Sequence, residues 1–180
     1  MKLKLIFGLL SSLLLIQFSY AQDAENNVVT NKWTLQCPKQ AEGKPTQCFT
    51  MTTLRSPQNK NYFASVAISK PVAEQLPTMQ ITTPLGVMLN QGINIQVGQS
   101  KVNKVPYNFC IAAGCITTAN VADDIMVSLN SSDQLALQFV LIGKRAANVN
   151  LDLKGFSDVY ASMVIEQEKL NNEFIAKKAE

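Results

Sequence analysis

Hydrophobic and polar residues alternate with a period of two along most of the chain after residue 32. In WTLQC, for example, Trp33, Leu35 and Cys37 share one face and the residues between them share the other. Such alternation is typical of half-buried β-strands. It predicts eight to ten short strands, placed at 33–37, 48–54, 62–68, two or three within 78–97, 105–110, 115–119, 134–142 and 148–153.

The predicted strands are short, and turn residues separate them. Pro84 and Gly86 make a bend between two strands, and Asn90 to Gly92 is a tight turn. The stretch 120–130 has helical spacing instead and predicts one short internal helix. We therefore expect an all-β fold, a compact β-sandwich or barrel-like domain of short antiparallel strands, with this internal helix and a C-terminal helix.

The C-terminal helix is predicted from an apolar stripe that Gln167 interrupts. Its residues recur at steps of four, three, seven and four, and they are Phe156, Tyr160, Met163, Leu170 and Phe174. Ser157 can cap such a helix, and Lys177 and Lys178 suit its C-terminus. We favour a helix that packs on the sandwich or frays beyond it. The other interpretation is an interaction helix that forms a homodimer through Tyr160, Met163, Leu170 and Phe174.

The first 21 residues have the pattern of a secretory signal peptide. Lys2 and Lys4 precede an apolar run of about a dozen residues. Small residues then precede the expected cleavage site, which follows Ala21. The apolar run is too short to span a membrane, and no spanning segment follows it. We expect a signal peptide at 1–21, a flexible lead at 22–32, a β domain at 33–160 and a helical tail at 161–180.

Four cysteines remain in the expected exported chain, and export favours disulfides. Three pairings of Cys37, Cys48, Cys110 and Cys115 are possible, and we favour the local one, which joins 37 with 48 and 110 with 115. Gly114 lets the backbone turn between the second pair. Redox and metal sites are disfavoured, because the spacings fit neither a helix-borne redox pair nor a zinc site.

The net charge and the absence of histidine argue against several classes of function. Without Lys2 and Lys4 the net charge is +1, and no basic run is present, so nucleic acid is not an expected partner. The chain has no histidine, which excludes histidine-based catalytic triads and histidine metal ligands. Adjacent Asp123 and Asp124 would point apart on a helix, so they make a poor acid–base couple. We expect neither an enzyme nor a cofactor.

Five segments in order make the chain resemble the invasion-associated locus B family of exported bacterial proteins. They are WTLQC followed by CF, PLGVMLNQGINIQV, PYNFCIAAGC and LKGFSDVY, and the resemblance covers 33–160. It implies a small β-rich protein of the Gram-negative periplasm, surface or exterior, with no catalytic motif. The paired cysteines, the bend at Pro84 to Gly86 and the pair Gly155–Phe156 match the family pattern. The longer helical tail after Tyr160 departs from it.

Two functions follow as hypotheses. The leading one is a non-enzymatic exported protein, retained in the periplasm, surface-associated or secreted, that binds a protein of the envelope or of a host cell and contributes to host interaction or virulence. The alternative is a periplasmic carrier of a small ligand. Met51, Met79, Met88 and Phe109 could line an apolar pocket for it, although such residues on strands are more often core.

Overall fold

The computed structural model describes residues 29–30, 32–39, 44–55, 62–70, 76–143 and 145–179. The predicted signal peptide and most of the predicted lead lie outside these residues. Two antiparallel sheets and two helices make up the described part, which confirms the predicted all-β fold with an internal and a C-terminal helix. Within the predicted lead, Val29 and Thr30 form a short strand, β1.

The larger sheet has seven strands in the order β1-β3-β4-β5-β9-β8, with β2 also paired to β3. Its strands are β1 (Val29–Thr30), β2 (Thr34–Gln36), β3 (Phe49–Arg55), β4 (Tyr62–Ser69), β5 (Thr78–Thr83), β8 (Phe109–Ile111) and β9 (Gly114–Asn120). Because β1 pairs with one end of β3 and β2 with the other, the two short strands share one edge of β3. At the opposite edge of the sheet, β8 pairs with β9.

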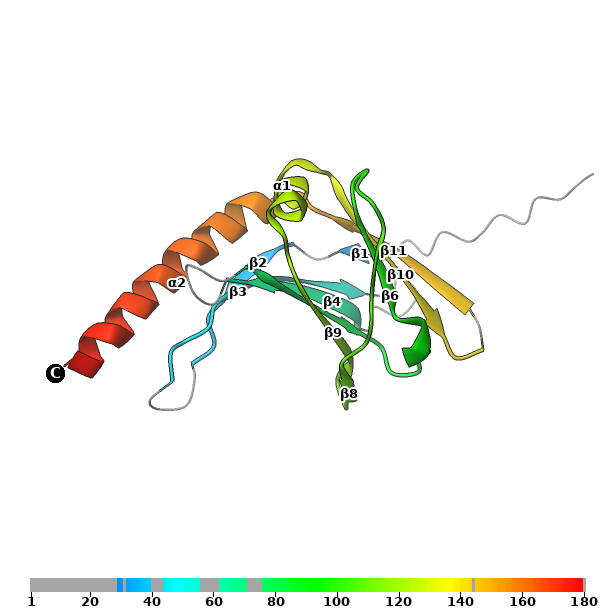
Figure 1. Cartoon of the computed structure of the whole chain (residues 1–180), viewed down its shortest axis with the longest axis horizontal. Coiled ribbons are helices and arrows are strands. Elements are labelled where there is room, and N and C mark those ends of the chain that lie inside the picture. Colours follow the sequence, from blue (N-terminus) through cyan, green and yellow to red (C-terminus); the bar gives the residue numbers. More distant parts are fainter. Residues whose placement is uncertain are drawn as a thin grey trace, which may run out of the picture.

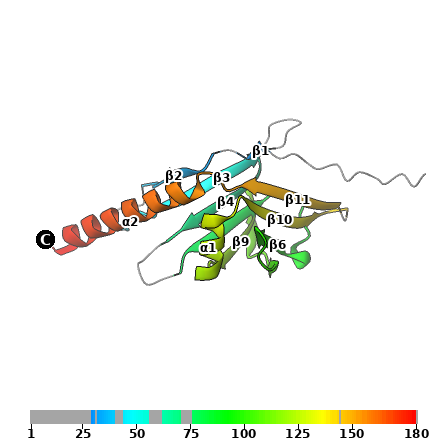
Figure 2. The ribbon, with the colours of Figure 1, turned by 90° about the horizontal axis from the view of Figure 1, so that it is seen from above.

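The smaller sheet has four strands in the order β11-β10-β6-β7. They are β6 (Ile93–Val97), β7 (Asn103–Val105), β10 (Gln134–Leu141) and β11 (Arg145–Asp152). A short 3-10 helix, η1 (Leu89–Gln91), precedes β6. The hairpin of β10 and β11 pairs along its full length, from Gln134 with Asp152 to Leu141 with Arg145. Figures 1 and 2 show the two sheets facing each other as layers.

Alternating side chains of both sheets form the core between the layers. Leu135, Leu137 and Phe139 of β10 are buried, and so are Ala64, Val66 and Ile68 of β4. The polar residues between them face outward, as the period-two pattern predicts for a sheet with one buried face. Burial of this apolar surface is the main force that holds the two layers together.

The two helices close one end of the sandwich. The internal helix α1 (Asp123–Ser131) confirms the predicted helix at 120–130 but begins three residues later. The delay arises because β9 continues to Asn120 and the Val121 N–H then donates to the Pro77 carbonyl. The C-terminal helix α2 (Phe156–Ala179) lies beside β2 and β3 and extends past them (Figures 1 and 2).

Helix α2 is continuous across the domain boundary that the sequence suggested between residues 160 and 161. Its first residue, Phe156, is fully buried, and the Phe156 ring packs edge-on against Trp33, with ring centroids 4.9 Å apart. The first turns of the helix are therefore part of the folded domain. No helix among the described residues has both the length and the apolar character needed to cross a membrane.

Candidate interaction site at a disulfide-closed sheet edge

The hairpin of β8 and β9 is closed by the disulfide Cys110–Cys115. The two cysteines pair directly across the strands, with an S–S distance of 2.08 Å and a Cα–Cα distance of 3.9 Å. This confirms the favoured local pairing. Cys110 is exposed on the edge strand and Cys115 is buried in the core. The disulfide therefore joins the exposed edge to the interior.

Gly114 is required at this hairpin for a steric reason. Its φ is +144°, a conformation that side chains rarely adopt, and a Cβ there would collide with the backbone carbonyl oxygen of Thr83 on β5. The predicted bend at Gly114 thus coincides with the point where β9 starts to pair with β5. Only glycine lets the two backbones come this close.

Side chains also fasten the segment that leads into β8. Asn108 Oδ1 accepts hydrogen bonds from the backbone N–H and the hydroxyl of Thr118, at 2.7 and 2.8 Å. The Thr117 hydroxyl donates to the Pro106 carbonyl at 3.3 Å. These bonds fix both faces of the hairpin stem, because Thr117 and Thr118 point to opposite sides of β9.

A second set of contacts supports the hairpin from within. The Thr83 hydroxyl lies 3.2 Å from the Tyr107 hydroxyl and 3.3 Å from the Cys115 carbonyl oxygen. Tyr107 packs against the core, and burial raises the pKa of its hydroxyl, although the hydrogen bond with Thr83 acts in the opposite direction. Tyr107 is therefore neutral at physiological pH and serves as a support.

The tip of this hairpin exposes apolar side chains. Phe109 is 55% exposed and Ile111 is 49% exposed, and Ala112 and Ala113 between the strands are exposed as well. Phe109 and Ile111 lie on one face of β8, because side chains alternate along a strand. Strand β8 is also the last strand of its sheet, so its outer edge has no partner among the described residues. We call residues 109–113 the β8–β9 tip.

The second disulfide, Cys37–Cys48, closes the loop between β2 and β3 and also confirms the favoured pairing. Gln167 of α2 is buried beside this disulfide. Its side-chain amide forms hydrogen bonds with backbone groups of the loop. Gln167 Oε1 accepts from the Cys48 N–H at 2.6 Å, and Nε2 donates to the Thr46 carbonyl at 2.9 Å. The residue that interrupts the apolar stripe is thus the one that fastens the helix to this loop.

The residues of the predicted interaction helix divide into two groups. Met163 is fully buried, and the Tyr160 ring stacks on Phe156 at a centroid distance of 5.6 Å. Both therefore pack within the chain, and Met163 has no exposed surface for a dimer interface, whereas Tyr160 stays partly exposed. Leu170 and Phe174 lie beyond Gln167 and are partly exposed. The favoured interpretation, a helix packed on the sandwich, holds for the first half of α2, and homodimerisation through its second half stays a prediction.

The other predicted bends also lie where the chain turns. Pro84 follows β5 directly, and the carbonyl of Gly86, whose φ is +88°, accepts a hydrogen bond from the Ile142 N–H just after β10. Gly155 has a φ of +79° and separates β11 from α2. Ser157, the predicted cap, lies one residue inside the helix.

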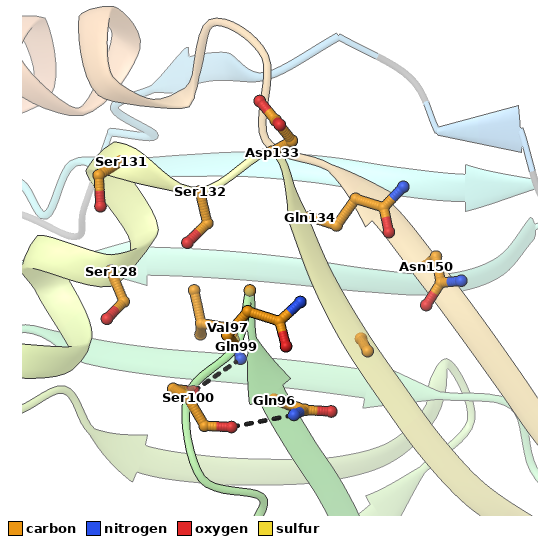
Figure 3. A pocket seen from close by; sticks show the side chains of 12 residues that line it. Gln96, Val97, Gln99, Ser100, Ser128, Ser131, Ser132, Asp133, Gln134 and Asn150 are labelled. Carbon is orange, nitrogen blue, oxygen red and sulfur yellow. Dashed lines mark hydrogen bonds between the residues drawn. The ribbon is translucent and has the colours of Figure 1, made fainter.

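A polar groove lies between α1 and the outer face of the smaller sheet (Figure 3). Its volume is about 800 Å³, and its lining combines hydroxyl and carboxamide side chains, among them Ser128, Ser132, Gln134 and Asn150. Asp133 is the one titratable residue among those that line it. Within the described residues, no hydrogen bond joins a serine of the groove to the Asp133 carboxylate, so the groove shows no serine paired with a base.

Part of the hydrogen-bonding capacity of this groove is already used within the chain. The Ser100 hydroxyl accepts from the Val97 N–H, and the Ser100 carbonyl accepts from Gln96 Nε2 (Figure 3). The Ser128 and Ser131 hydroxyls donate to helix carbonyls one turn back. The groove is thus a weaker candidate than the β8–β9 tip.

The structure does not gather the four residues that were predicted to line a ligand pocket. Met79 lines a cleft between α1 and β7, but that cleft does not include Met51, Met88 or Phe109. Met51 alternates with the inward-facing Thr50 and Thr52 on β3, so it faces outward. Phe109 belongs to the tip. Among the described residues, no three Cys, Asp or Glu side chains come close enough to hold a metal ion.

Comparison with known proteins identifies relatives of the whole β domain. The model of the family described as invasion associated locus B (IalB) protein matches residues 33–164. The crystal structure of invasion associated protein B from Bartonella henselae is similar with a TM-score of 0.66 and 22% sequence identity, over 78% of this chain and 98% of that one. A search of curated proteins gave no match.

The solved structure shows that the fold is shared. The family match covers both disulfides, the first turns of α2 and every strand except β1. The family is not a known family of enzymes. The chain belongs to the invasion associated locus B family.

Proposed function

We propose that this protein is an exported, non-enzymatic binding protein that docks another protein through the β8–β9 tip. The single observation that carries the proposal is the exposed apolar pair Phe109 and Ile111 on an unpaired sheet edge that a disulfide holds in one shape. Exposed apolar side chains gathered at one place typically mark interaction sites.

The chemistry of the tip indicates the kind of partner. An edge strand offers backbone donors and acceptors to an extended segment, and alternate side chains supply apolar contacts. Residues 109–113 contain no charged side chain. We therefore infer a protein partner that presents an extended, apolar segment. The disulfide and the Asn108 hydrogen bonds reduce the entropy that ordering the tip would otherwise cost on binding.

The signal-peptide pattern at 1–21 and the disulfides, which persist in oxidising compartments, support a place of action outside the cytoplasm. We propose that the protein works in the periplasm or at the cell surface, on an envelope protein or a host-cell protein. Contribution to host interaction is part of this proposal, because the similar Bartonella henselae protein is named as invasion-associated.

The experiment compares two double variants in affinity capture from solubilised envelopes of the source bacterium and from host-cell membranes. Phe109→Ser with Ile111→Ser removes the apolar pair. Val127→Ser with Ile165→Ser is the matched control, because these side chains are 65% and 68% exposed on α1 and α2. We expect a protein that the wild-type chain and the control capture, and that the tip variant loses by tenfold or more.

Equal capture by both variants would contradict docking through the tip. Size-exclusion chromatography of the purified chain distinguishes a further case. If the wild type is a dimer and only the tip variant is a monomer, the partner at the tip is a second copy, which overturns the proposal of a different protein. Melting curves and thiol counts of each variant verify that it is folded with both disulfides.

A further inference from the structure

The connection from β5 to β6 and the turn from β10 to β11 meet at the end of the sandwich that lies away from α1. Figure 1 shows this turn at the far end of β10 from α1. The Met88 N–H donates to the Val140 carbonyl, and the Ile142 N–H donates to the Gly86 carbonyl, both at 2.7 Å. Val87 between them is buried in the core. These contacts hold the two segments together in one shape.

Three large aliphatic side chains are exposed on these two segments. Leu85 lies two residues after β5, Leu89 begins η1, and Ile142 directly follows β10. Ile142 is 70% exposed, more than any other large apolar residue that the structure describes. Exposed apolar side chains gathered at one place typically mark an interaction surface.

Two cations flank these aliphatic side chains. Arg145 is exposed and pairs with Leu141 across the hairpin of β10 and β11. Lys104 of β7 is exposed, and its Cε lies 3.5 Å from the position that a Cβ on Gly92, directly after η1, would occupy. Neither cation takes part in a salt bridge within the part of the chain that the structure describes. We call the following five residues the open-end patch: Leu85, Leu89, Lys104, Ile142 and Arg145.

The acidic residues lie elsewhere on the molecule. In the described part of the chain, all of them are in α1 and α2 or next to the ends of β10 and β11 that adjoin these helices: Asp123, Asp124, Asp133, Asp152, Asp158, Glu166, Glu168 and Glu173. The segments 84–92 and 141–145 contain no acid. The open-end patch is therefore apolar and positive, and its charge is complementary to a broad anionic surface.

We propose that the open-end patch binds the surface of a bilayer that contains anionic phospholipid. The three aliphatic side chains enter the interfacial region, and Lys104 and Arg145 lie beside headgroup phosphates. Apolar burial and attraction to anionic lipids are the two contributions that bind proteins to a membrane surface in this way.

This proposal goes beyond docking at the β8–β9 tip and rests on different residues. The tip lies at the same end of the sandwich, because Cys115 at the start of β9 pairs with Thr83 at the end of β5. Binding through the open-end patch would therefore bring the tip close to the membrane surface, where an envelope protein or a host-cell membrane protein is within reach.

The experiment measures flotation of the purified folded chain with protein-free vesicles. One set contains phosphatidylcholine and phosphatidylglycerol in a ratio of about three to one, and the other contains phosphatidylcholine alone. We expect binding to the anionic vesicles that weakens as salt rises, and binding to the neutral vesicles that is tenfold or more weaker. No binding to the anionic vesicles, or equal binding to both sets, would overturn the proposal.

A first double variant tests the apolar contribution. Leu85→Ser with Ile142→Ser should weaken binding to the anionic vesicles tenfold or more, because it removes two of the three aliphatic side chains. Val127→Ser with Ile165→Ser is the matched control on the exposed surface of α1 and α2 and should bind like wild type. Unchanged binding by the first variant would rule out insertion of the open-end patch.

A second double variant tests the cations. Lys104→Gln with Arg145→Gln should weaken binding to the anionic vesicles roughly tenfold or more, because each basic residue near an anionic leaflet contributes a factor of about five. Lys154→Gln with Lys177→Gln removes the same charge from the other end of the molecule. Equal loss in both variants would show non-specific attraction and contradict the assignment.

The tip variant Phe109→Ser with Ile111→Ser separates this proposal from the proposed function. It should keep vesicle binding, because the vesicles contain no protein, and lose capture from solubilised envelopes, where no bilayer is present. A loss of vesicle binding as large as that of Leu85→Ser with Ile142→Ser would contradict the open-end patch as the membrane contact. If the wild type ignores vesicles and this last variant loses a captured protein, the patch docks a protein and the membrane proposal is wrong.

Discussion

At the scale of single residues, Gln167 shows how a polar side chain can complete an apolar stripe. It lies at the expected position between Met163 and Leu170, and it is buried. Its amide satisfies the Cys48 N–H and the Thr46 carbonyl, groups that burial would otherwise leave without partners. The sequence presented Gln167 as an interruption because nothing in it shows that a backbone loop faces the helix there.

Substitution of Gln167 tests this role. Gln167→Ala should lower the free energy of unfolding by roughly 1–3 kcal/mol, because the Cys48 N–H loses its acceptor in a buried place. Gln167→Met keeps the volume without the hydrogen bonds, so it should recover only the packing part of the loss. Chemical denaturation measures both. A Gln167→Met variant as stable as wild type would contradict the importance of the hydrogen bonds.

Gly114 is the second residue whose role is local and steric. Gly114→Ala should cost about 3 kcal/mol or more, because the new methyl group meets the Thr83 carbonyl and the backbone has to move. Gly143→Ala is the matched control, since Gly143 also has a positive φ but its Cβ would meet nothing within 4 Å. It should cost about 1 kcal/mol. Equal losses in thermal unfolding would argue against a close approach at Gly114.

At the scale of elements, the period-two pattern located most strands but did not show which strands pair with each other. The segment 115–119 was predicted as a strand without a place in a sheet, and β9 lies between β5 and β8 and is buried over its first four residues. Strands β1 and β7, with two and three residues, are too short to show an alternation. Leu35 was expected on a face with Trp33, but β2 is a short edge strand and Leu35 is exposed.

The two disulfides should stabilise different parts of the chain. Removing either pair, as Cys110→Ala with Cys115→Ala or Cys37→Ala with Cys48→Ala, should cost about 2–3 kcal/mol on the chain-entropy model. Hydrogen exchange should then quicken at 108–116 in the first variant, and at 46–49 and in the facing part of α2 in the second. Faster exchange at the same residues in both variants would contradict the view that each disulfide stabilises a separate part of the chain.

Helix α2 should be divisible at the Gln167 contacts. Ending the chain after Asn172 keeps Gln167 and its partner Asn171, so the melting temperature should change little. Ending it after Glu166 removes the contacts with the 46–48 backbone and should lower stability by roughly 1–3 kcal/mol. Equal melting temperatures for the two truncations would contradict a stabilising role of the Gln167 contacts.

At the scale of the whole molecule, the sequence predicted the fold class, both helices and the favoured disulfide pairing, because these depend on local periodicity and on short loops. It did not predict the proposed interaction site at the β8–β9 tip. Phe109 was considered as a core residue or as a lining residue of a ligand pocket, since a sequence pattern does not show which strand ends a sheet. Exposure of Phe109 and Ile111 follows from the position of β8 at that edge, which long-range pairing determines.

Site-specific photo-crosslinking in intact cells tests the central claim most directly. A photoreactive phenylalanine analogue replaces Phe109 in one full-length chain and Ile165, an exposed residue of α2, in another. Docking at the tip predicts a covalent protein adduct from position 109 and none from position 165. An adduct from position 165 alone, or equal adducts from both positions, would contradict it.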